Sequence, residues 1–415
     1  MGVRSETVTD IVWFLKLVAV QAVIFLACAW LSLNSKDSRS VLILVLIFAA
    51  LFRLSIVFSP PYLSDDIYRF IWDGRVQAAG INPYRYIPAD QSLAGLRDEA
   101  IYPKINRRDY AHTMYPPVAE GAFFVTTRLS ESVTWMKVTM IAFEGVAIWA
   151  IIQLLASFGF ARQRVLIYAW HPLPVWEFAG SGHLDAIAVA FVALALWLFR
   201  RDAHKSTGVM LACAALVKFF PAVLLPTFFR RFNWKMPLAF VATVVLAYAP
   251  YMSVGLSKVF GYLPGYAEER GIVSGDQFLI LAVVRRFFFA GIPMLAYLIV
   301  ALLLLAAVSV WLRRSQQENG LAYLRDGLVL ASVFMVLLTP HFSWYFCWLI
   351  VFLCFIPSTA IFYQTLASFL LYLTWLGDPP DKVLALKALI FVPSFVLSLL
   401  VIWLRRRRIT LGFVS

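Results

Sequence analysis

The sequence contains little charge for its length. Of its 415 residues only 14% are charged, whereas 62% are hydrophobic. A soluble domain is about half apolar and about a quarter charged, so this chain has more apolar surface than one water-facing shell can enclose. This balance excludes an ordinary soluble enzyme and a disordered chain. The apolar residues form continuous runs, which also argues against a membrane β-barrel, whose strands alternate apolar and polar residues.

Residues that bind metals or phosphates are scarce as well. The chain has 4 cysteines and 5 histidines. All the cysteines lie in apolar runs, at spacings that fit neither a disulfide framework nor a metal site: Cys28, Cys213, Cys347 and Cys354. No side chains have the spacing of a zinc site, and no Gly-rich phosphate-binding loop is present. We therefore predict no metal and no other cofactor.

Long apolar runs are what the sequence does have. Crossing a bilayer takes about 20 helical residues, and a segment in lipid must satisfy its own backbone groups, as a helix does. Clear runs cover 11–33, 41–59, 134–158, 207–229, 237–254, 293–312, 359–376 and 384–404, and shorter ones cover 116–130, 164–180, 184–199, 327–340 and 343–357. We predict an all-α fold, a polytopic transmembrane helical bundle of about 13 spans. It would form a single integral membrane domain over residues 1–415.

Two polar stretches interrupt these runs, at residues 60–115 and 255–290. Short connections rich in Lys and Arg mark the cytoplasmic side of a bundle, and the net charge of +13 fits this role without a nucleic-acid partner. The basic segment 405–408 is the strongest such anchor. Counting spans back from it places the 60–115 loop outside. The same count places the basic residues of 200–205 outside, against the rule, unless one span before them is miscounted.

The first of these loops carries the most specific signal. A helix is predicted over 65–79, because Ser64 is a good N-cap and Gly80 is a good stop. Apolar and polar residues fall on different sides of it, as in an amphipathic interfacial helix that lies at a membrane surface. The apolar side has Ile67, Phe70, Ile71 and Ala78, and a polar side has Asp66, Arg69 and Asp73.

The adjacent acids Asp65 and Asp66 have two interpretations. Acidic residues suit the first turn of any helix because they interact favourably with its dipole, and Arg69 lies within ion-pair reach of both and of Asp73. Two adjacent carboxylates also suit general-base catalysis, since neighbouring carboxylates raise one another's proton affinity. In that case Arg69 and Arg75 could hold a phosphate.

The loop contains the segments Ser64-Asp65-Asp66-Ile67-Tyr68-Arg69, Trp72-Asp73-Gly74-Arg75 and Gly80-Ile81-Asn82-Pro83-Tyr84. Further segments downstream are Tyr115-Pro116-Pro117, Gly182-His183-Leu184-Asp185, Lys218-Phe219-Phe220-Pro221 and Pro340-His341-Phe342-Ser343-Trp344-Tyr345. With these motifs the chain resembles the bacterial polyprenyl-phosphate-sugar-dependent membrane glycosyltransferases of the GT-C superfamily, mannosyltransferase type. The resemblance covers about residues 40–400.

The resemblance implies an inverting glycosyltransferase that moves a hexose, mannose first of all, from a polyprenyl-phosphate donor to a glycan or lipid-linked acceptor. An aspartate of the first outer loop is the usual base in this family. Of the pair we expect Asp65, with Asp66 as its orienting partner or substitute, although the sequence alone does not separate them. The donor phosphate would be held by Arg69, Arg75, Lys218 and His341, and the substrates by Tyr68, Trp72, Tyr115, His171, Glu177, His183 and Asp185.

Polar groups within apolar runs are the other candidates, because a charge at the centre of a span costs about 2.5–3.5 kcal/mol and tends to be functional. Lys218 either snorkels to an interface, contacts the donor phosphate or meets an acidic partner. The stretch 170–185 contains prolines that break a helix, so we expect it to line the site. His183 and Asp185 could equally form a local turn at the end of a span. Glu144 is a lone acid that could pair within the bundle.

Two other functions fit a polytopic bundle. A transporter or flippase of lipid-linked saccharide is one, but the chain shows neither the internal repeat nor the paired broken helices that many transporters have. A non-catalytic partner in envelope-polysaccharide assembly is the other, and it leaves the adjacent aspartates unexplained. We therefore favour a transferase in the bacterial inner membrane, with its active site facing outward.

Overall fold

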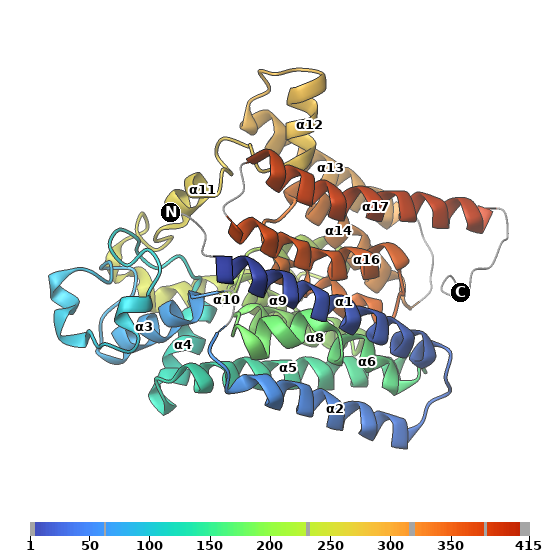
Figure 1. Cartoon of the computed structure of the whole chain (residues 1–415), viewed down its shortest axis with the longest axis horizontal. Coiled ribbons are helices and arrows are strands. Elements are labelled where there is room, and N and C mark those ends of the chain that lie inside the picture. Colours follow the sequence, from blue (N-terminus) through green and yellow to red (C-terminus); the bar gives the residue numbers. More distant parts are fainter. Residues whose placement is uncertain (1–4, 62–63, 230–232, 315–319, 377–379, 407–415) are drawn as a thin grey trace.

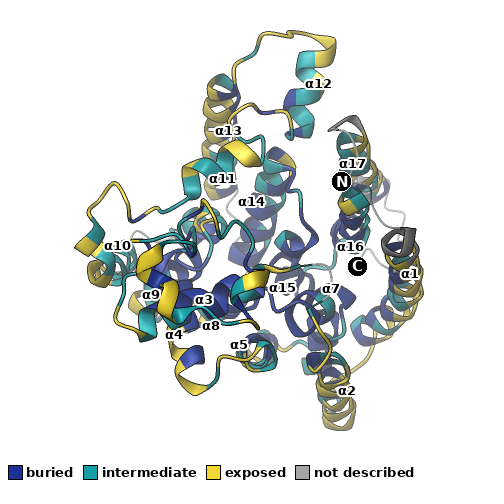
Figure 2. Ribbon diagram, turned by 60° about the vertical axis from the view of Figure 1, so that its left-hand side comes forward, coloured by how far each residue is buried: buried dark blue, intermediate teal, exposed yellow. Residues whose placement is uncertain are grey.

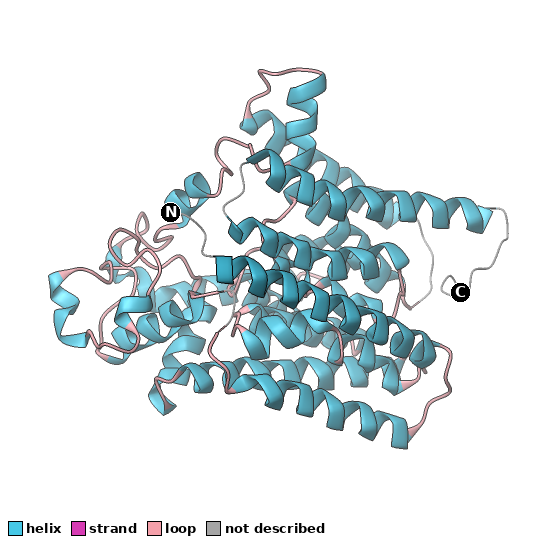
Figure 3. Cartoon of the chain, in the orientation of Figure 1, coloured by secondary structure: helices cyan, strands magenta, loops and turns pink. Residues whose placement is uncertain are grey.

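Helices are the only regular secondary structure in the parts of the chain that its computed structural model describes, which are residues 5–61, 64–229, 233–314, 320–376 and 380–406. Figure 3 shows helices joined by loops, and no strand occurs within these residues. The all-α prediction is confirmed. Residues 407–408 of the basic C-terminal segment lie outside the described residues.

Seven helices of the described chain are long and apolar enough to cross a membrane. They are α1 (Ser5–Leu33), α2 (Arg39–Val57), α5 (Val133–Ser157), α10 (Lys235–Tyr248) continued by η6 (Ala249–Val254), α13 (Met294–Arg314), α16 (Thr359–Ala367) continued by η8 (Ser368–Leu376), and α17 (Pro380–Arg406). The predicted count of about 13 spans is not confirmed, because several of the shorter predicted spans are broken helices.

Several of the long helices lie on the outside of the bundle, where they expose apolar side chains. Figure 2 shows exposed residues along α1, α2 and α13, and Trp13, Leu54 and Leu302 are among the exposed large apolar side chains. A monomer in water rarely exposes a continuous apolar face of this size. In hydrocarbon the same face is solvated favourably, which fits an integral membrane protein.

Shorter helices fill the centre of the bundle. The longest of these are α8 (Asp185–Arg200), α9 (His204–Ala215) and α14 (Ala322–Leu338), followed by η7 (Ser343–Phe346) and α15 (Leu349–Leu353). Residues of α8 that face its neighbours α5 and α9 are small, and Ala186, Ala190 and Ala193 are buried. Small side chains let helix backbones approach closely in a membrane bundle.

The proline-containing stretch before α8 is broken into pieces, as the sequence predicts. It consists of α6 (Leu166–Ala169), α7 (Pro172–Pro174) and the π-helical turn η4 (Val175–Gly180). Proline lacks a backbone N–H and cannot continue an α-helix from within. The irregular backbone is buried among other helices rather than exposed to lipid, which is the condition under which it is tolerated in a membrane.

Two loops lie at one end of the bundle, which we call the loop end (Figure 1). The first loop, 60–115, contains α3 (Asp66–Ala78), η1 (Gln91–Leu96) and η2 (Tyr102–Lys104), and is followed by α4 (Pro117–Leu129). The second loop, 255–290, contains α11 (Leu263–Glu269) and α12 (Leu279–Phe287). The loops touch each other, since the Tyr262 backbone N–H donates to Thr113 O at 3.1 Å.

Basic residues gather at the opposite end, which we call the basic end. Asp37, between α1 and α2, forms an ion pair with Arg162 after α5 (2.8 Å). Arg200, at the end of α8, donates to Ser157 O (3.4 Å) and stacks on the Phe158 ring. The basic residues of 200–205 therefore lie at the end away from the first loop, and the count that placed them beside it is wrong.

The reason is α4, which does not cross the bundle although its sequence is apolar enough to suggest a span. The next helix, α5, begins back at the loop end, where Lys137 Nζ donates to the Ser59 carbonyl oxygen at 2.7 Å. When α4 is not counted as a span, the predicted direction in which each helix from α5 to α8 crosses the bundle is reversed. The connections rich in Lys and Arg then fall on one side, as the positive-inside rule requires.

A buried ion pair joins the early helices. Arg53 of α2 donates to both carboxylate oxygens of Glu144 in α5, at 2.7 and 3.1 Å, and also to the Ala169 carbonyl oxygen at 2.7 Å. Both side chains are almost wholly buried. The sequence-based suggestion that Glu144 pairs within the bundle is confirmed. A bidentate pair of this kind satisfies charges that lipid could not.

Candidate active site

A cavity of about 630 Å³ lies at the loop end of the bundle. Its walls come from both loops, from the start of α8, from the turn after α9, from the connection between α14 and η7, and from α17. It therefore gathers segments that lie more than 300 residues apart, from Ser64 to Lys387. The volume is within the range of small-molecule sites, about 300–1,000 Å³.

One wall of the cavity carries the two adjacent carboxylates at the N-terminus of α3. Ser64 Oγ accepts a hydrogen bond from the Asp66 backbone N–H at 3.3 Å. Asn106 Nδ2 donates to Asp65 Oδ1 at 2.8 Å and to Asp66 Oδ1 at 2.7 Å. Asp65 is exposed and Asp66 is half-buried. The pair is thus held from two sides while it borders the cavity.

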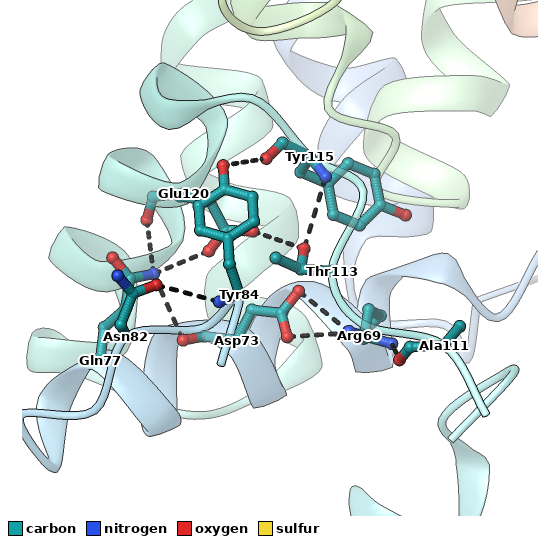
Figure 4. A network of polar contacts seen from close by, with 9 residues as sticks. All are labelled: Arg69, Asp73, Gln77, Asn82, Tyr84, Ala111, Thr113, Tyr115 and Glu120. Atoms are coloured by element: carbon teal, nitrogen blue, oxygen red, sulfur yellow. Dashed lines mark hydrogen bonds and ion pairs between the residues drawn. The ribbon is translucent and has the colours of Figure 1, made fainter. Parts of the chain in front are cut away.

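A buried polar network fixes α3 in place (Figure 4). Arg69 Nε donates to both Asp73 carboxylate oxygens, at 2.8 and 3.0 Å, and its Nη1 donates to the Ala111 carbonyl oxygen at 3.1 Å. Burial raises the pKa of Asp73, although the charge of Arg69 opposes this. Thr113 donates to Glu120 of α4 at 2.7 Å. The network ties α3 to α4 and to the end of the first loop, and it uses Arg69 for that purpose.

Close packing against α4 fixes the same helix from another side. A Cβ atom on Gly74 would lie 2.6 Å from the Phe123 carbonyl oxygen and from the Thr127 side chain, so only glycine fits here. Phe70 stacks on Phe123 with ring centroids 4.5 Å apart. The face of α3 that an amphipathic pattern would turn to the membrane is instead covered by α4.

The centre of the cavity contains a second, paired carboxylate. Lys218 Nζ lies 2.8 and 2.7 Å from the two oxygens of Asp185. The same ammonium lies 4.1 Å from the centroid of the Tyr345 ring. Of the three interpretations of Lys218, the structure shows the acidic partner.

His183 forms part of an aromatic stack beside this pair. Its ring lies on Trp344 with centroids 3.9 Å apart, and Trp344 lies on Phe342 at 4.4 Å. Behind it, His183 Nδ1 is 3.0 Å from Glu177 Oε2, and Tyr372 donates to Glu177 Oε1 at 2.6 Å. All three rings line the cavity, so this part of its wall is aromatic.

The cavity wall also carries three basic side chains, Arg270, His341 and Lys387, which we call the basic cluster. Lys387 projects from α17 and donates to the Gln277 carbonyl oxygen at 2.7 Å. Burial, together with the charges of Lys387 and Arg270, lowers the pKa of His341 to about 4. In the part of the chain that the structure describes, His341 Nδ1 is buried without a hydrogen-bond partner. Near neutral pH the His341 imidazole is therefore uncharged, and the cluster combines the positive side chains of Arg270 and Lys387 with an imidazole nitrogen that has no partner among the described residues.

An ion pair between the two loops borders the cavity. Arg107 of the first loop donates to Glu269 of α11 at 2.6 Å, and Tyr262 donates to the same carboxylate at 2.7 Å. Burial acts to raise the pKa of Glu269, but these hydrogen bonds lower it below its usual value. Tyr266, one turn earlier, has its hydroxyl 3.3 Å from that of Tyr345. These contacts hold α11 against the first loop.

Residues 4–231 match the family described as alpha-(1->6)-mannopyranosyltransferase, N-terminal domain. The match covers more than half of the chain and includes the first loop and Lys218. The chain belongs to this family. No curated protein and no solved structure gives a match. The predicted resemblance to a GT-C-type mannosyltransferase is thereby confirmed, and a mannosyltransferase function with a sugar donor and an acceptor follows from it.

The cavity of this mannosyltransferase brings together about half of the residues that the sequence proposed for the site. Those that line it are Asp65, Asp66, Tyr115, His183, Asp185, Lys218 and His341. They come from distant segments that the family motifs had identified one by one. Their roles stay predictions, but their position around one cavity is consistent with a single shared site.

The other proposed residues do not line the cavity; they are Arg69, Arg75, Tyr68, Trp72, His171 and Glu177. Arg75 is engaged by Asp98 and Glu131, each at 2.8 Å. His171 accepts the Leu173 backbone N–H at its Nδ1, and Glu177 stands behind His183. These residues support the site rather than face it in this structure.

Among the cavity-wall residues that the sequence did not identify are Asn106, Arg107 and Lys387. Lys387 did carry a signal, since it is a charged residue inside the apolar run 384–404, where a charge is costly. Asn106 and Arg107 lie in a loop without any local pattern. Only the tertiary structure places them beside the aspartates.

The described residues contain no group of three or more His, Cys, Asp or Glu side chains arranged to hold a metal ion. The expectation that the activity does not depend on a metal stays a prediction. The positive charge that a metal would supply elsewhere is present here in side chains of the basic cluster.

Proposed function

We propose that this mannosyltransferase transfers a mannosyl group from a polyprenyl-phosphate donor to a hydroxyl group of a glycan or lipid-linked acceptor, with inversion at the anomeric carbon. The observation that carries the proposal is the cavity itself, because its lining includes both the pair of carboxylates and the basic cluster. An acceptor hydroxyl needs a base, and a departing phosphate needs positive charge and hydrogen-bond donors. The residues around the cavity could supply both the base for the acceptor and the positive charge for the leaving phosphate.

In the proposed reaction the acceptor oxygen attacks the anomeric carbon as the bond from that carbon to the phosphate oxygen breaks. The acceptor proton passes to a carboxylate of the Asp65–Asp66 pair. The polyprenyl phosphate leaves with the bonding electrons as an anion, stabilised by Arg270, His341 and Lys387. The family description names an α-(1→6) linkage. A single inverting displacement would then require a β-linked donor and a primary C6 hydroxyl as nucleophile.

Of the two aspartates, the geometry favours Asp66 as the base. Asp66 is half-buried, and its charge acts on Arg107, Tyr115 and Tyr345 around the cavity. Asp65 is exposed and fits the role of partner. The sequence analysis had favoured Asp65 as the base and Asp66 as its partner, so each residue needs a separate test.

We further propose that the site faces the outside of a bacterial inner membrane. The support is the charge distribution, because Arg162 and Arg200 lie at the basic end, away from the cavity. Short connections rich in Lys and Arg remain on the cytoplasmic side. The lipid phosphate and the acceptor would therefore meet at the outer surface. Because Arg270 and Lys387 supply the positive charge, we expect activity to survive removal of divalent metals by a chelator.

The test is a transfer assay with purified protein, radiolabelled mannosyl polyprenyl phosphate and an extract of membrane lipids and glycans as acceptor. The wild-type protein should move label to a new product, and Asp66→Asn should lower the rate by about 10²–10⁴-fold, as loss of a general base does. Asp65→Asn is measured beside it, with thermal unfolding as the check on folding. Full activity in both variants would refute the base assignment. Absence of transfer from mannosyl, glucosyl and arabinosyl polyprenyl phosphates would refute the donor class.

A further inference from the structure

The adjacent aspartates share a single partner in the first loop. Asn106 Nδ2 lies 2.8 Å from Asp65 Oδ1 and 2.7 Å from Asp66 Oδ1. A side-chain amide nitrogen carries two hydrogens and accepts none, so one NH₂ group can serve both carboxylates in their anionic form. Because both partners are acidic oxygens, the amide is oriented with its nitrogen toward them.

We propose that Asn106 is the positioning residue of this carboxylate pair, which rests on the proposed function of the pair as base. Adjacent side chains at the start of a helix diverge, and two negative charges repel each other. A common donor offsets that repulsion and fixes both Oδ1 atoms about one nitrogen. The remaining oxygen of Asp66 is then directed by the position of Asn106 rather than by free rotation of the side chain.

The backbone around Asn106 is itself held to α3. On one side, Lys104 Nζ lies 5.1 Å from the centroid of the Tyr68 ring. On the other, the Ala111 carbonyl oxygen accepts from Arg69 Nη1 at 3.1 Å. The first loop is therefore attached to α3 on both sides of Asn106, through the neighbouring residues Tyr68 and Arg69, and these contacts help to fix Asn106 beside the aspartates.

The turn that presents Asn106 is maintained by a contact to the second loop. Arg107 has a φ of 54°, in the left-handed region that a residue with a side chain adopts at a cost. Its backbone carbonyl accepts the Ala111 N–H at 3.0 Å, and its side chain forms the ion pair with Glu269. This conformation aims the side chains of Asn106 and Arg107 at different partners, one toward α3 and one toward α11.

The role makes a specific kinetic prediction. Asn106→Ala should lower kcat about 10- to 100-fold, the usual effect of losing a group that orients a catalytic side chain, and leave the KM for the donor within about twofold. Asn106→Asp fills the same volume but replaces the donor by a third negative charge. It should therefore be at least as inactive as Asn106→Ala, whereas a residue that only fills space would tolerate the isosteric change better.

Asn82 provides the matched control in the same loop. Its amide also donates twice, to Tyr251 O at 2.8 Å and to Ser253 Oγ at 2.9 Å, but it does not line the cavity. Asn82→Ala should lower the thermal unfolding midpoint while keeping kcat within about twofold of wild type. The amide oxygen of Asn82 also accepts from the Tyr84 backbone N–H at 3.1 Å, so the variant measures what the loss of these three side-chain hydrogen bonds does to the loop without touching the aspartates.

The experiment compares kcat and donor KM for the three asparagine variants with those of Asp65→Asn and Asp66→Asn, using purified full-length protein and mannosyl polyprenyl phosphate. An inactive aspartate variant together with a fully active Asn106→Ala would overturn the inference and leave the proposed function standing. An Asn106→Asp variant more active than Asn106→Ala would overturn it as well, as would an equal loss of kcat in Asn82→Ala. Full activity in both aspartate variants would remove the proposed base and this inference with it.

Discussion

Substituting Gly182 by alanine would test how the broken helix positions the aspartates. Gly182 has a φ of 77°, where an L-residue with a side chain is disfavoured by about 1–2 kcal/mol. A Cβ at this position would lie 2.4 Å from Ile67 Cδ1 on α3. Forcing an extra carbon into a packed site costs about 1–3 kcal/mol more. We therefore expect Gly182→Ala to destabilise the protein by about 2–5 kcal/mol.

The same clash should disturb catalysis, because Ile67 follows the aspartates directly in the chain. Ile67 is buried, so relief of the clash either forces its side chain into a new position or moves α3, and a displacement of the aspartates by about 1 Å can cost about 10²-fold in rate. Transfer activity and chemical unfolding in detergent are measured on the same preparations. We expect lower kcat and lower stability together.

A second substitution isolates the contact that causes the effect. Ile67→Val removes Cδ1, the atom nearest the added Cβ, and should by itself cost about 0.5–1.5 kcal/mol. In the double variant Gly182→Ala/Ile67→Val the clash is reduced, so it should be more stable than the sum of the single effects by about 1 kcal/mol or more. Additivity within about 0.5 kcal/mol would refute the reasoning, since the contact would then carry no energy.

Three further predictions concern other parts of the structure. His341→Ala should raise the KM for the donor more than it lowers acceptor binding, and unchanged donor kinetics would contradict its place in the basic cluster. Arg53→Met should destabilise the bundle by about 3–5 kcal/mol by leaving Glu144 buried and unpaired, whereas Arg53→Met/Glu144→Leu should recover much of this in detergent unfolding. Glu269→Gln should remove the stabilisation from Arg107. Because the pKa of Glu269 is lowered, that stabilisation is present above its usual value of about 4.5 and lost as the pH falls below it, so the variant should differ from wild type at pH 7 and converge with it in acid.

Local signals in the sequence were sufficient for the elements that depend on neighbouring residues. The first-loop helix was expected over 65–79 and is observed over Asp66–Ala78, with Asp65 and not Ser64 at its N-cap position. The glycine stop at Gly80 is confirmed, because such a stop acts within a few residues. The break at the prolines before α8 was predicted for the same reason. The Arg69–Asp73 ion pair also follows from helical spacing alone, as one of the two interpretations had recognised.

Two features of the long-range arrangement could not be predicted from the sequence. The apolar run that became α4 has the composition of a short span, yet its Glu120 is buried against the first loop and it does not cross the bundle. The basic cluster comes from three separate segments around Arg270, His341 and Lys387, each of which has an ordinary explanation when it is read alone. Only their convergence on one cavity distinguishes them from lipid-headgroup contacts.

The contact between α3 and α4 has a consequence for the dependence of this enzyme on its membrane. A helix held only by the bilayer surface would change its position along the membrane normal when the thickness of the bilayer changes. Here Gly74 packs directly against the backbone of α4, so contacts within the protein fix the position of Asp65 and Asp66 along the membrane normal. Changing from short-chain to long-chain lipids would then alter how the donor is presented, while the distance between the carboxylates and the basic cluster would stay the same.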